Sequence, residues 1–304
     1  MKVLVIGGNG FIGSHLIDQL LIEGHDVRVF DIAHERYRKP LVNVDYRIST
    51  LDNIPDLYEA LLGIDIVFHL ASSTVPSTSN IDTVSDINKN LIPTLNLLNL
   101  MVKLGIKRIV YFSSGGAIYG NPKSIPIEED HPLHPISSYG VIKATVEMYL
   151  FLYQRLHNIK PLIIRPSNPY GPRQGHYMAQ GVISTFLRKV KLNESLIIFG
   201  DGNSKKDYIY INDLINTCLK LSFSNETGTF NIGSGSCYSV NEIIAVIKEK
   251  TTKELFTVNS EMQKYDVDHF ELDITKLKQV IGDHKFITLD NGIEKTWNWI
   301  LSID

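Results

Sequence analysis

The first half of the chain alternates short apolar runs with longer amphipathic stretches. Short apolar runs are typical of strands buried on both faces, and a repeat near 3.6 residues predicts helices. We expect strands at 2–6, 26–30, 64–69, 109–113 and 161–165. The intervening stretches predict helices at 11–23, 57–62, 84–103 and 139–157. This alternation predicts right-handed βαβ crossovers and an α/β fold, a doubly wound parallel sheet of the Rossmann type.

The pattern becomes irregular after Arg165. Residues 167–173 are rich in Pro and Gly, which indicates a loop. Farther on we expect a strand at 195–199 and helices near 180–191, 240–251 and 289–301. We therefore predict a Rossmann-type domain over residues 1–166, rejoined by part of 205–234, and a smaller α/β domain over 167–304.

Composition narrows the class of protein. The 304 residues are 43% hydrophobic and 21% charged, which is too apolar for a disordered chain and long enough for two domains. The net charge is −3 and no basic run occurs, so we expect no nucleic-acid partner. No segment approaches the roughly 20 apolar residues that span a bilayer. The two cysteines, Cys218 and Cys237, have no metal-ligand spacing, so we expect a cytoplasmic protein without a metal.

Three glycines follow the first predicted strand and open the first predicted helix. Gly7 would permit a tight turn, Gly10 would let backbone amides approach a pyrophosphate, and Gly13 would let the helix pack closely. The same spacing also occurs in turns that bind nothing. The second strand, however, ends at Asp31, roughly 20 residues on, where an acid would bind the adenosine ribose. An acid there favours NAD over NADP, although Arg36 and Arg38 stand close enough to meet a phosphate.

Two segments match Tyr-x-x-x-Lys. Tyr119 to Lys123 contains a glycine and a proline, which excludes a helix interior. Tyr139 to Lys143 opens a long helical pattern after two serines that are suited to cap it, so both side chains would lie on one face. A free tyrosine has a pKa of about 10, and a nearby ammonium favours the phenolate. We expect Tyr139 to accept a hydroxyl proton while a hydride leaves the same carbon.

These features together resemble the extended short-chain dehydrogenase/reductase family, and most closely its nucleotide-sugar epimerases of the UDP-glucose 4-epimerase type. The resemblance runs nearly end to end. Besides the glycine loop and the Tyr139–Lys143 pair, it rests on segments 68–71, 112–114, 165–173, 198–202, 207–214 and 230–233, and on Asn90 with Thr94.

The resemblance assigns roles by position. It implies that Tyr139 and Lys143 are catalytic and that NAD is held around Gly7, Gly10, Phe11, Ile12, Gly13, Asp31, Ile32, Leu51, Leu70, Ala71, Asn90, Ser113, Tyr139, Lys143 and Pro166. It implies that the second domain binds a nucleotide sugar, UDP-linked as in the epimerases that the chain resembles, through Asn168, Phe199, Lys206, Lys264 and Phe270. Members often form homodimers through two helices, here those at 84–103 and 139–157.

Several positions depart from the family pattern. The Ser or Thr that bonds the reacting hydroxyl is replaced by Gly115, so we expect Ser114 to substitute for it, or else a water or the backbone of Ala117. The Asp-Glu pair of the dehydratases falls on Gly116 and Ala117, and the Glu of the decarboxylases also falls on Ala117. Two arginines that clamp the diphosphate fall on Lys206 and near Gln263-Lys264, and lysine lacks the guanidinium fork. Phe270 takes the position that gates the sugar, and its bulk favours a plain hexose.

The leading hypothesis is an NAD-dependent epimerase acting at C4 of a UDP-hexose through a 4-keto intermediate. A 4-keto nucleotide-sugar reductase or dehydrogenase is the alternative within the same chemistry. A dinucleotide-binding protein with weakened catalysis is the non-enzymatic alternative, favoured by Gly115, Lys206 and Gln263 and opposed by Tyr139 and Lys143.

Overall fold

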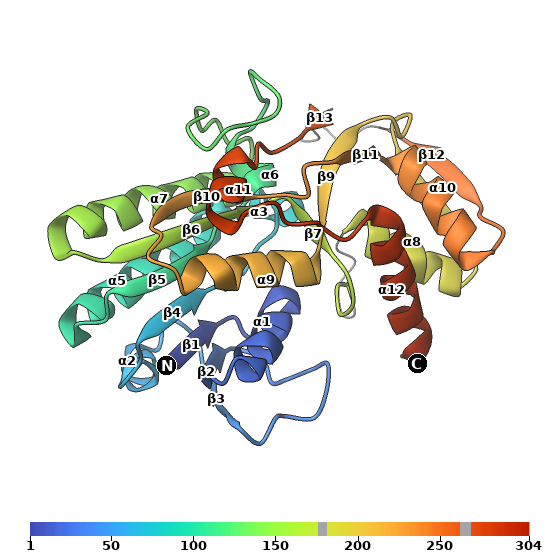
Figure 1. Cartoon of the computed structure of the whole chain (residues 1–304). Helices are drawn as coiled ribbons and strands as arrows, with labels where there is room; N and C mark the ends of the chain where they lie inside the picture. The colour runs from blue at the N-terminus through green and yellow to red at the C-terminus, as the bar shows by residue number, and fades with distance from the viewer. Residues whose placement is uncertain (176–180, 262–268, 304) are drawn as a thin grey trace. The chain divides into compact units, whose positions relative to one another are not determined.

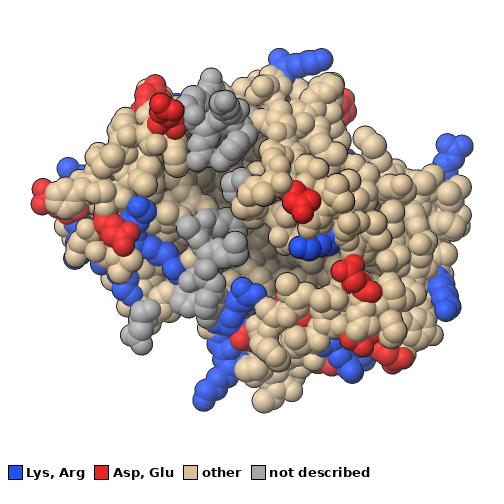
Figure 2. Space-filling model, turned by 180° about the vertical axis from the view of Figure 1, so that it is seen from behind, with Lys and Arg blue, Asp and Glu red and all other residues tan. Residues whose placement is uncertain are grey.

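The computed structural model describes residues 1–175, 181–261 and 269–303. The chain divides into two compact units. One comprises residues 1–120, 132–165 and 218–230, and the other comprises 121–131, 166–217 and 231–304. Within the described residues no helix is both long and apolar enough to cross a membrane. Figure 2 shows one face, on which Lys and Arg side chains are interspersed with Asp and Glu.

The first unit is built on a parallel sheet. Its elements are β1 (Lys2–Ile6), α1 (Phe11–Ile22), β2 (Asp26–Asp31), β3 (Val44–Ile48), α2 (Ile54–Leu61), β4 (Ile66–His69), α3 (Pro76–Ser79), α4 (Thr83–Asp86), the π-helical turn η1 (Ile87–Leu91), α5 (Ile92–Leu104), β5 (Arg108–Phe112), α6 (Gly115–Ile118), α7 (Ser138–His157), β6 (Lys160–Pro166) and the later strand β10 (Gly228–Ile232) (Figure 1).

The strand order is β10-β6-β5-β4-β1-β2-β3, and each neighbouring pair from β6 to β3 is parallel. The doubly wound Rossmann sheet expected from the sequence is therefore confirmed. The order reverses between β1 and β4, because β2 lies on one side of β1 and β4 on the other. In such sheets ligands bind at this switch point, beyond the carboxyl ends of the strands.

Burial follows from the alternation of side chains along the strands. Leu4 and Ile6 of β1 face a core completed by α2, α5 and α7, where Leu57, Leu97 and Val146 are buried. Helix α5 packs against both α2 and α7, and Figure 1 shows α5 and α7 side by side. On the other face Ile17 of α1 lies against Val29 of β2.

The second unit contains β7 (Asn168–Tyr170), α8 (Val182–Lys191), β8 (Leu196–Phe199), β9 (Lys205–Tyr210), α9 (Ile211–Ser222), β11 (Cys237–Ser239), α10 (Val240–Thr251), β12 (Thr257–Ser260), β13 (His269–Phe270), α11 (Thr275–Ile281) and α12 (Leu289–Ser302). Part of α9 and the segment after it belong to the first unit. A four-stranded sheet has the order β11-β9-β13, and β7 extends it by pairing with β9. Helices α8, α10 and α12 pack on one another around residues such as Phe186, Ile247 and Trp297.

Three differences from the expected elements have local causes. Helix α2 begins at Ile54 rather than Leu57, because the Asn53 side chain accepts the Asp56 amide at 3.3 Å and Pro55 occupies the first turn. The helix expected over 84–103 is interrupted by η1. The sheet also includes β3 and β10, two strands for which no apolar run stood out in the sequence.

We predict that Gly13→Ala destabilises the fold. A Cβ at this position would stand 2.4 Å from the Gly7 carbonyl oxygen and 2.7 Å from the Gly8 Cα, so backbone must move. A comparable overpacking costs about 1–3 kcal/mol. Urea denaturation measures this loss in the free energy of unfolding. Gly10→Ala is the matched control, because its Cβ would meet only the Gly7 oxygen, at 3.3 Å. Equal stability of the two variants would contradict the prediction.

Candidate active site

The glycine loop joins the carboxyl end of β1 to the start of α1. Gly7 has a φ of 81°, a left-handed conformation that favours glycine. A Cβ on Gly7 would lie 2.7 Å from the Ala71 amide nitrogen, so the loop closely approaches the chain that leaves β4. Gly10 precedes the first helical residue, Phe11, and the amides that follow it have no partner within the helix. This arrangement fits a pyrophosphate at the helix N-terminus.

Asp31 connects the end of β2 to this loop. One carboxylate oxygen accepts the Asn9 amide at 2.9 Å and the other accepts the Ala33 amide at 3.0 Å. A carboxylate offers about four acceptor positions, so capacity remains for two ribose hydroxyls. The geometry is compatible with the role predicted for Asp31.

Arg38, one of the two arginines that could meet a 2′-phosphate, is already paired with acids of this chain. Arg38 forms an ion pair with Asp18 and a second, at 3.3 Å, with Glu35. Its guanidinium is therefore engaged by two carboxylates of the chain itself. This pairing disfavours Arg38 as a receptor for a 2′-phosphate.

Tyr139 and Lys143 lie in the first two turns of α7. The Ser137 side chain caps this helix by accepting the Gly140 amide at 3.2 Å. The Lys143 ammonium donates to the Phe112 carbonyl oxygen at 2.7 Å and lies 5.6 Å from the centre of the Tyr139 ring. A Cβ at Gly140 would stand 2.2 Å from the Ala117 oxygen, so α6 and α7 meet closely beside the pair.

Burial dominates the acid–base properties of the pair. Burial raises the pKa of Tyr139 to about 12, with a hydrogen bond from Ser114 opposing and Asp86 adding to the rise. Burial lowers the pKa of Lys143 to about 8, while Glu147 and Asp86 raise it. The lowered tyrosine pKa expected from Lys143 is not produced by this chain alone, because the ammonium is bonded to the Phe112 carbonyl and contacts the tyrosine ring face.

Ser114 lies where the family's Ser or Thr would contact the catalytic tyrosine. Its side chain hydrogen-bonds the Tyr139 hydroxyl, although the residue aligned with the family's Ser or Thr is Gly115. Ser114 is the N-cap residue of α6, directly after β5, so its side chain leaves the chain one position earlier. The structure thus brings Ser114, Tyr139 and Lys143 together.

Asp86 is a site residue that the sequence did not single out. Its carboxylate is 1% exposed and accepts from Thr74 at 2.7 Å, from Asn90 at 2.7 Å and from Ser138 at 2.6 Å. Asn90 lies in η1, and π-helical turns often occur at functional sites. The useful signal was that Asp86 is the lone acid of the helix predicted over 84–103, four residues before Asn90.

A pocket in the first unit is lined by side chains from the carboxyl ends of β4 and β5, from the segment after β4, and from α4, η1, α5 and α7. Its lining residues are His69, Ala71, Ser72, Thr74, Asp86, Asn90, Thr94, Tyr111, Tyr139, Ile142 and Lys143. Burial and the Lys143 ammonium lower the pKa of His69 to about 3, so this ring is neutral. Buried polar atoms without a hydrogen-bond partner, among the described residues, include Asn9 Oδ1, His69 Nδ1 and Ser113 Oγ.

The remaining cofactor candidates differ in exposure. Leu51 and Ala71 are partly buried against the core, Ile32 is 71% exposed, and Pro166 is the buried last residue of β6. The rejected motif has a different task, because the Tyr119 hydroxyl accepts the Arg165 guanidinium at 2.7 Å. Arg165 also forms a buried pair with Glu147 of α7 at 2.6 Å.

The substrate candidates lie in the second unit. The Asn168 amide donates to the Asp207 carbonyl oxygen at 2.8 Å, and Lys206 lies on β9. Phe199 is 45% exposed at the end of β8. Phe270 is buried at 3% exposure. Lys264 and Gln263 lie outside the described residues.

Comparison with known proteins decides the family. Residues 3–233 match the model of the NAD dependent epimerase/dehydratase family. The chain belongs to this family. A Methanocaldococcus jannaschii protein, provisionally named a UDP-glucose 4-epimerase, is 37% identical, with 98% of each chain covered. An Escherichia coli dTDP-4-dehydro-6-deoxyglucose reductase is 32% identical over 96% of this chain and 95% of its own.

The structure of Thermotoga maritima UDP-glucose 4-epimerase with UDP-glucose is similar throughout, with a TM-score of 0.94, 34% identity and 99% of each chain covered. The family is NAD-dependent, so the cofactor is NAD, as the glycine loop and Asp31 predicted. The close approach at Gly7 and the unpartnered Asn9 and Ser113 atoms fit this group. The roles of the individual residues stay predictions.

We predict that Asp86→Asn shifts the pH dependence of turnover. The charge of Asp86 raises the pKa of Tyr139, so its removal lowers that pKa. Because the base must be deprotonated, the rate falls as the pH drops below the pKa of Tyr139, and this limb should move to lower pH. The pH profile of kcat/KM measures the shift. Asp82→Asn, which removes an exposed acid at the start of the same α4 helix, should leave the limb in place.

Proposed function

We propose that the protein is an NAD-dependent 4-epimerase of a nucleotide sugar, with a UDP-hexose of the glucose/galactose type as substrate. The observation that carries the proposal is the grouping of half-buried Ser114 and Tyr139 with the buried Lys143 ammonium, which donates to the carboxyl end of β5. Its similarity to UDP-glucose 4-epimerases over nearly the whole chain supports the proposal. The second unit would bind the nucleotide sugar through Asn168, Phe199, Lys206, Lys264 and Phe270.

The residues of the chain divide the work. Tyr139 takes the proton of the 4-hydroxyl group, and Ser114 holds the tyrosine and sugar oxygens by donating or accepting a hydrogen bond. NAD, when bound, would supply the hydride acceptor and donor, and the positive charge of its nicotinamide ring would favour the Tyr139 phenolate. Lys143, fixed at the Phe112 carbonyl, holds a positive charge beneath the tyrosine ring. The 4-keto sugar would then turn over, so that C4 receives the hydride on its other face while Tyr139 returns the proton to the 4-oxygen.

The α6 segment favours epimerisation over elimination. Dehydration and decarboxylation in this family use acids that fall here on Gly116 and Ala117. Neither residue has an ionisable side chain, and Ala117 is buried at 7% exposure. A general acid for water or carbon dioxide loss is therefore missing from the α6 segment.

A 4-keto nucleotide-sugar reductase is the second candidate. The 32% identity to the Escherichia coli reductase supports it. A reductase consumes NADH in proportion to product, whereas an epimerase recycles its cofactor. Absorbance of NADH during turnover therefore separates the two.

We predict that the protein interconverts UDP-glucose and UDP-galactose, and that Tyr139→Phe abolishes this while NAD still binds. Loss of the base should lower kcat by about 10²–10⁴-fold. Proton NMR of the sugar follows turnover, and calorimetry follows NAD binding. Tyr119→Phe is the matched control from the other Tyr-x-x-x-Lys segment; it should lose stability through its Arg165 bond but keep turnover.

No interconversion of either UDP-hexose by NAD-loaded protein would refute the substrate assignment. Full epimerase activity of Tyr139→Phe would refute the role of the tyrosine as the base.

We also propose a homodimer formed through α5 and α7. Tyr139, Lys143 and Glu147 occupy one face of α7, whereas the face turned roughly 200° away carries exposed apolar side chains. Val141, Met148, Leu152 and Leu156 are 48%, 63%, 44% and 61% exposed. Ile87 and Ile92 extend the apolar surface onto η1 and α5. Contiguous exposed apolar surface of this kind typically marks a protein interface.

We predict that the double substitution Met148→Glu with Leu152→Glu converts a dimer into a monomer of one chain mass, 34.3 kDa. Charges in an apolar interface lose hydration without gaining partners. Light scattering after size exclusion measures the mass. Leu192→Glu, which alters a leucine of the second unit that is as exposed as Met148, should remain dimeric. A monomeric wild type, or a dimeric double variant, would contradict the interface.

A further inference from the structure

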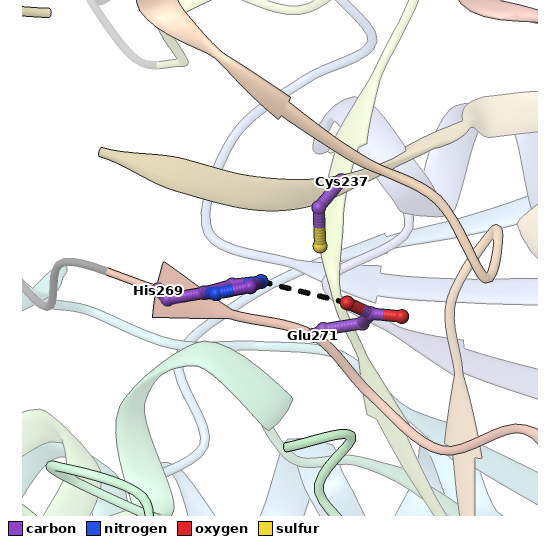
Figure 3. A group of neighbouring side chains, drawn as sticks. All are labelled: Cys237, His269 and Glu271. Carbon is purple, nitrogen blue, oxygen red and sulfur yellow. Dashed lines mark ion pairs between the residues drawn. The ribbon is translucent and has the colours of Figure 1, made fainter. Parts of the chain in front are cut away.

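Three side chains of the second unit converge at one point of its four-stranded sheet. Cys237 begins β11, His269 begins β13 and Glu271 follows β13. One ligand atom of each lies within 4.8 Å of the others. Figure 3 shows the thiol and the carboxylate both lying beyond the same edge of the imidazole ring. These residues take no part in the proposed epimerase chemistry.

The fold explains why residues so far apart in sequence meet. His269 and Glu271 are two positions apart in an extended segment, so their side chains leave the same side. Strand β9 lies between β11 and β13, with Cys237 opposite Asp207 and His269 opposite Lys205. Pairing of both outer strands with β9 thus fixes the distance from Cys237 to the other two.

The chemistry of the three groups suits a borderline-soft divalent cation. A thiolate, an imidazole and a carboxylate are the three side-chain types that ligate Zn²⁺ in proteins. Two nitrogen or oxygen ligands at about 2.0–2.1 Å from a tetrahedral metal stand about 3.4 Å apart. His269 Nε2 and Glu271 Oε2 are 3.5 Å apart, which fits this geometry without movement of the strand.

The local charge also favours a cation. The Asp207 and Glu271 carboxylates lie near the Cys237 thiol, as does the Lys205 ammonium. The thiol donates to the Phe270 carbonyl oxygen at 3.2 Å. The two carboxylates attract a dication, which can displace the thiol proton.

We propose that Cys237, His269 and Glu271 form a Zn²⁺ site with a fourth position open to water. Binding releases the thiol proton to solvent, and sulfur, imidazole nitrogen and carboxylate oxygen each give one bond to the metal. The His269 and Glu271 side chains are 44% and 30% exposed, so the ion can enter from solvent. Occupancy ties β13 to β11 on either side of β9. It also removes the thiol donor from the carbonyl of Phe270, the residue between the other two ligands.

Cobalt is the probe, because Co²⁺ substitutes for Zn²⁺ and reports its ligands by absorption. Chelator-treated full-length protein is titrated with Co²⁺, and then with Zn²⁺ in competition. We expect a near-ultraviolet thiolate-to-cobalt band and the intensified visible bands of tetrahedral Co²⁺, both abolished by Zn²⁺. Cys237→Ser should remove the thiolate band. Since loss of outer partners alone weakens metal binding by about 10–100-fold, His269→Ala and Glu271→Gln should each weaken it by at least about 10-fold.

Matched variants test the location of the site. Cys218→Ser changes the other cysteine, which is buried in α9, and His34→Ala changes an exposed histidine of the first unit; both should leave the titration unchanged. Unchanged urea midpoints show that each variant is folded. The proposal is overturned by a wild-type titration without a thiolate band, or by equal Co²⁺ affinity in folded Cys237→Ser, His269→Ala and Glu271→Gln.

Discussion

The hydrogen bond from the Lys143 ammonium to the Phe112 carbonyl oxygen organises the active site. It joins the second turn of α7 to the carboxyl end of β5 at 2.7 Å, and both Lys143 and Phe112 are buried. Tyr139 lies one helical turn before Lys143, and Ser114 lies two residues after Phe112. Fixing the helix to the strand therefore also sets the tyrosine beside the serine. A buried ammonium without this acceptor would carry the full cost of desolvation, so the contact is structural and chemical at once.

The features that could be predicted from sequence are those set by local periodicity. The Tyr139–Lys143 spacing, the Ser137 cap and the glycine loop depend on residues close in sequence, and the structure has the expected helix and turn. Strand β10 follows α9 far along the chain, and its place beside β6 is a long-range pairing that no local pattern specifies. The Asp86 network and the Cys237 cluster have the same origin. Each gathers polar residues from separate elements, which spacing along one segment does not reveal.

Ser114 shows how the structure changes the weight of a departure from a family pattern. Gly115 removes a side chain from the aligned position, yet the hydroxyl one residue earlier reaches Tyr139 from the N-cap of α6. The loss of a side chain at position 115 is thus offset by Ser114, whose side chain is directed to Tyr139 by the turn from β5 into α6. The closeness of Ala117 to Gly140 keeps α6 in place, because no larger residue fits between the two helices.

The two bonds of Asp31 have a consequence for how cofactor preference could change over time. The same carboxylate that would receive the ribose also holds the Asn9 and Ala33 amides. A mutation toward a 2′-phosphate-binding residue would leave two backbone donors unpaired and loosen the loop that it must preserve. The preference for NAD is in this way tied to the fold. An evolutionary path to NADP would need new acceptors for the Asn9 and Ala33 amides before Asp31 could be replaced.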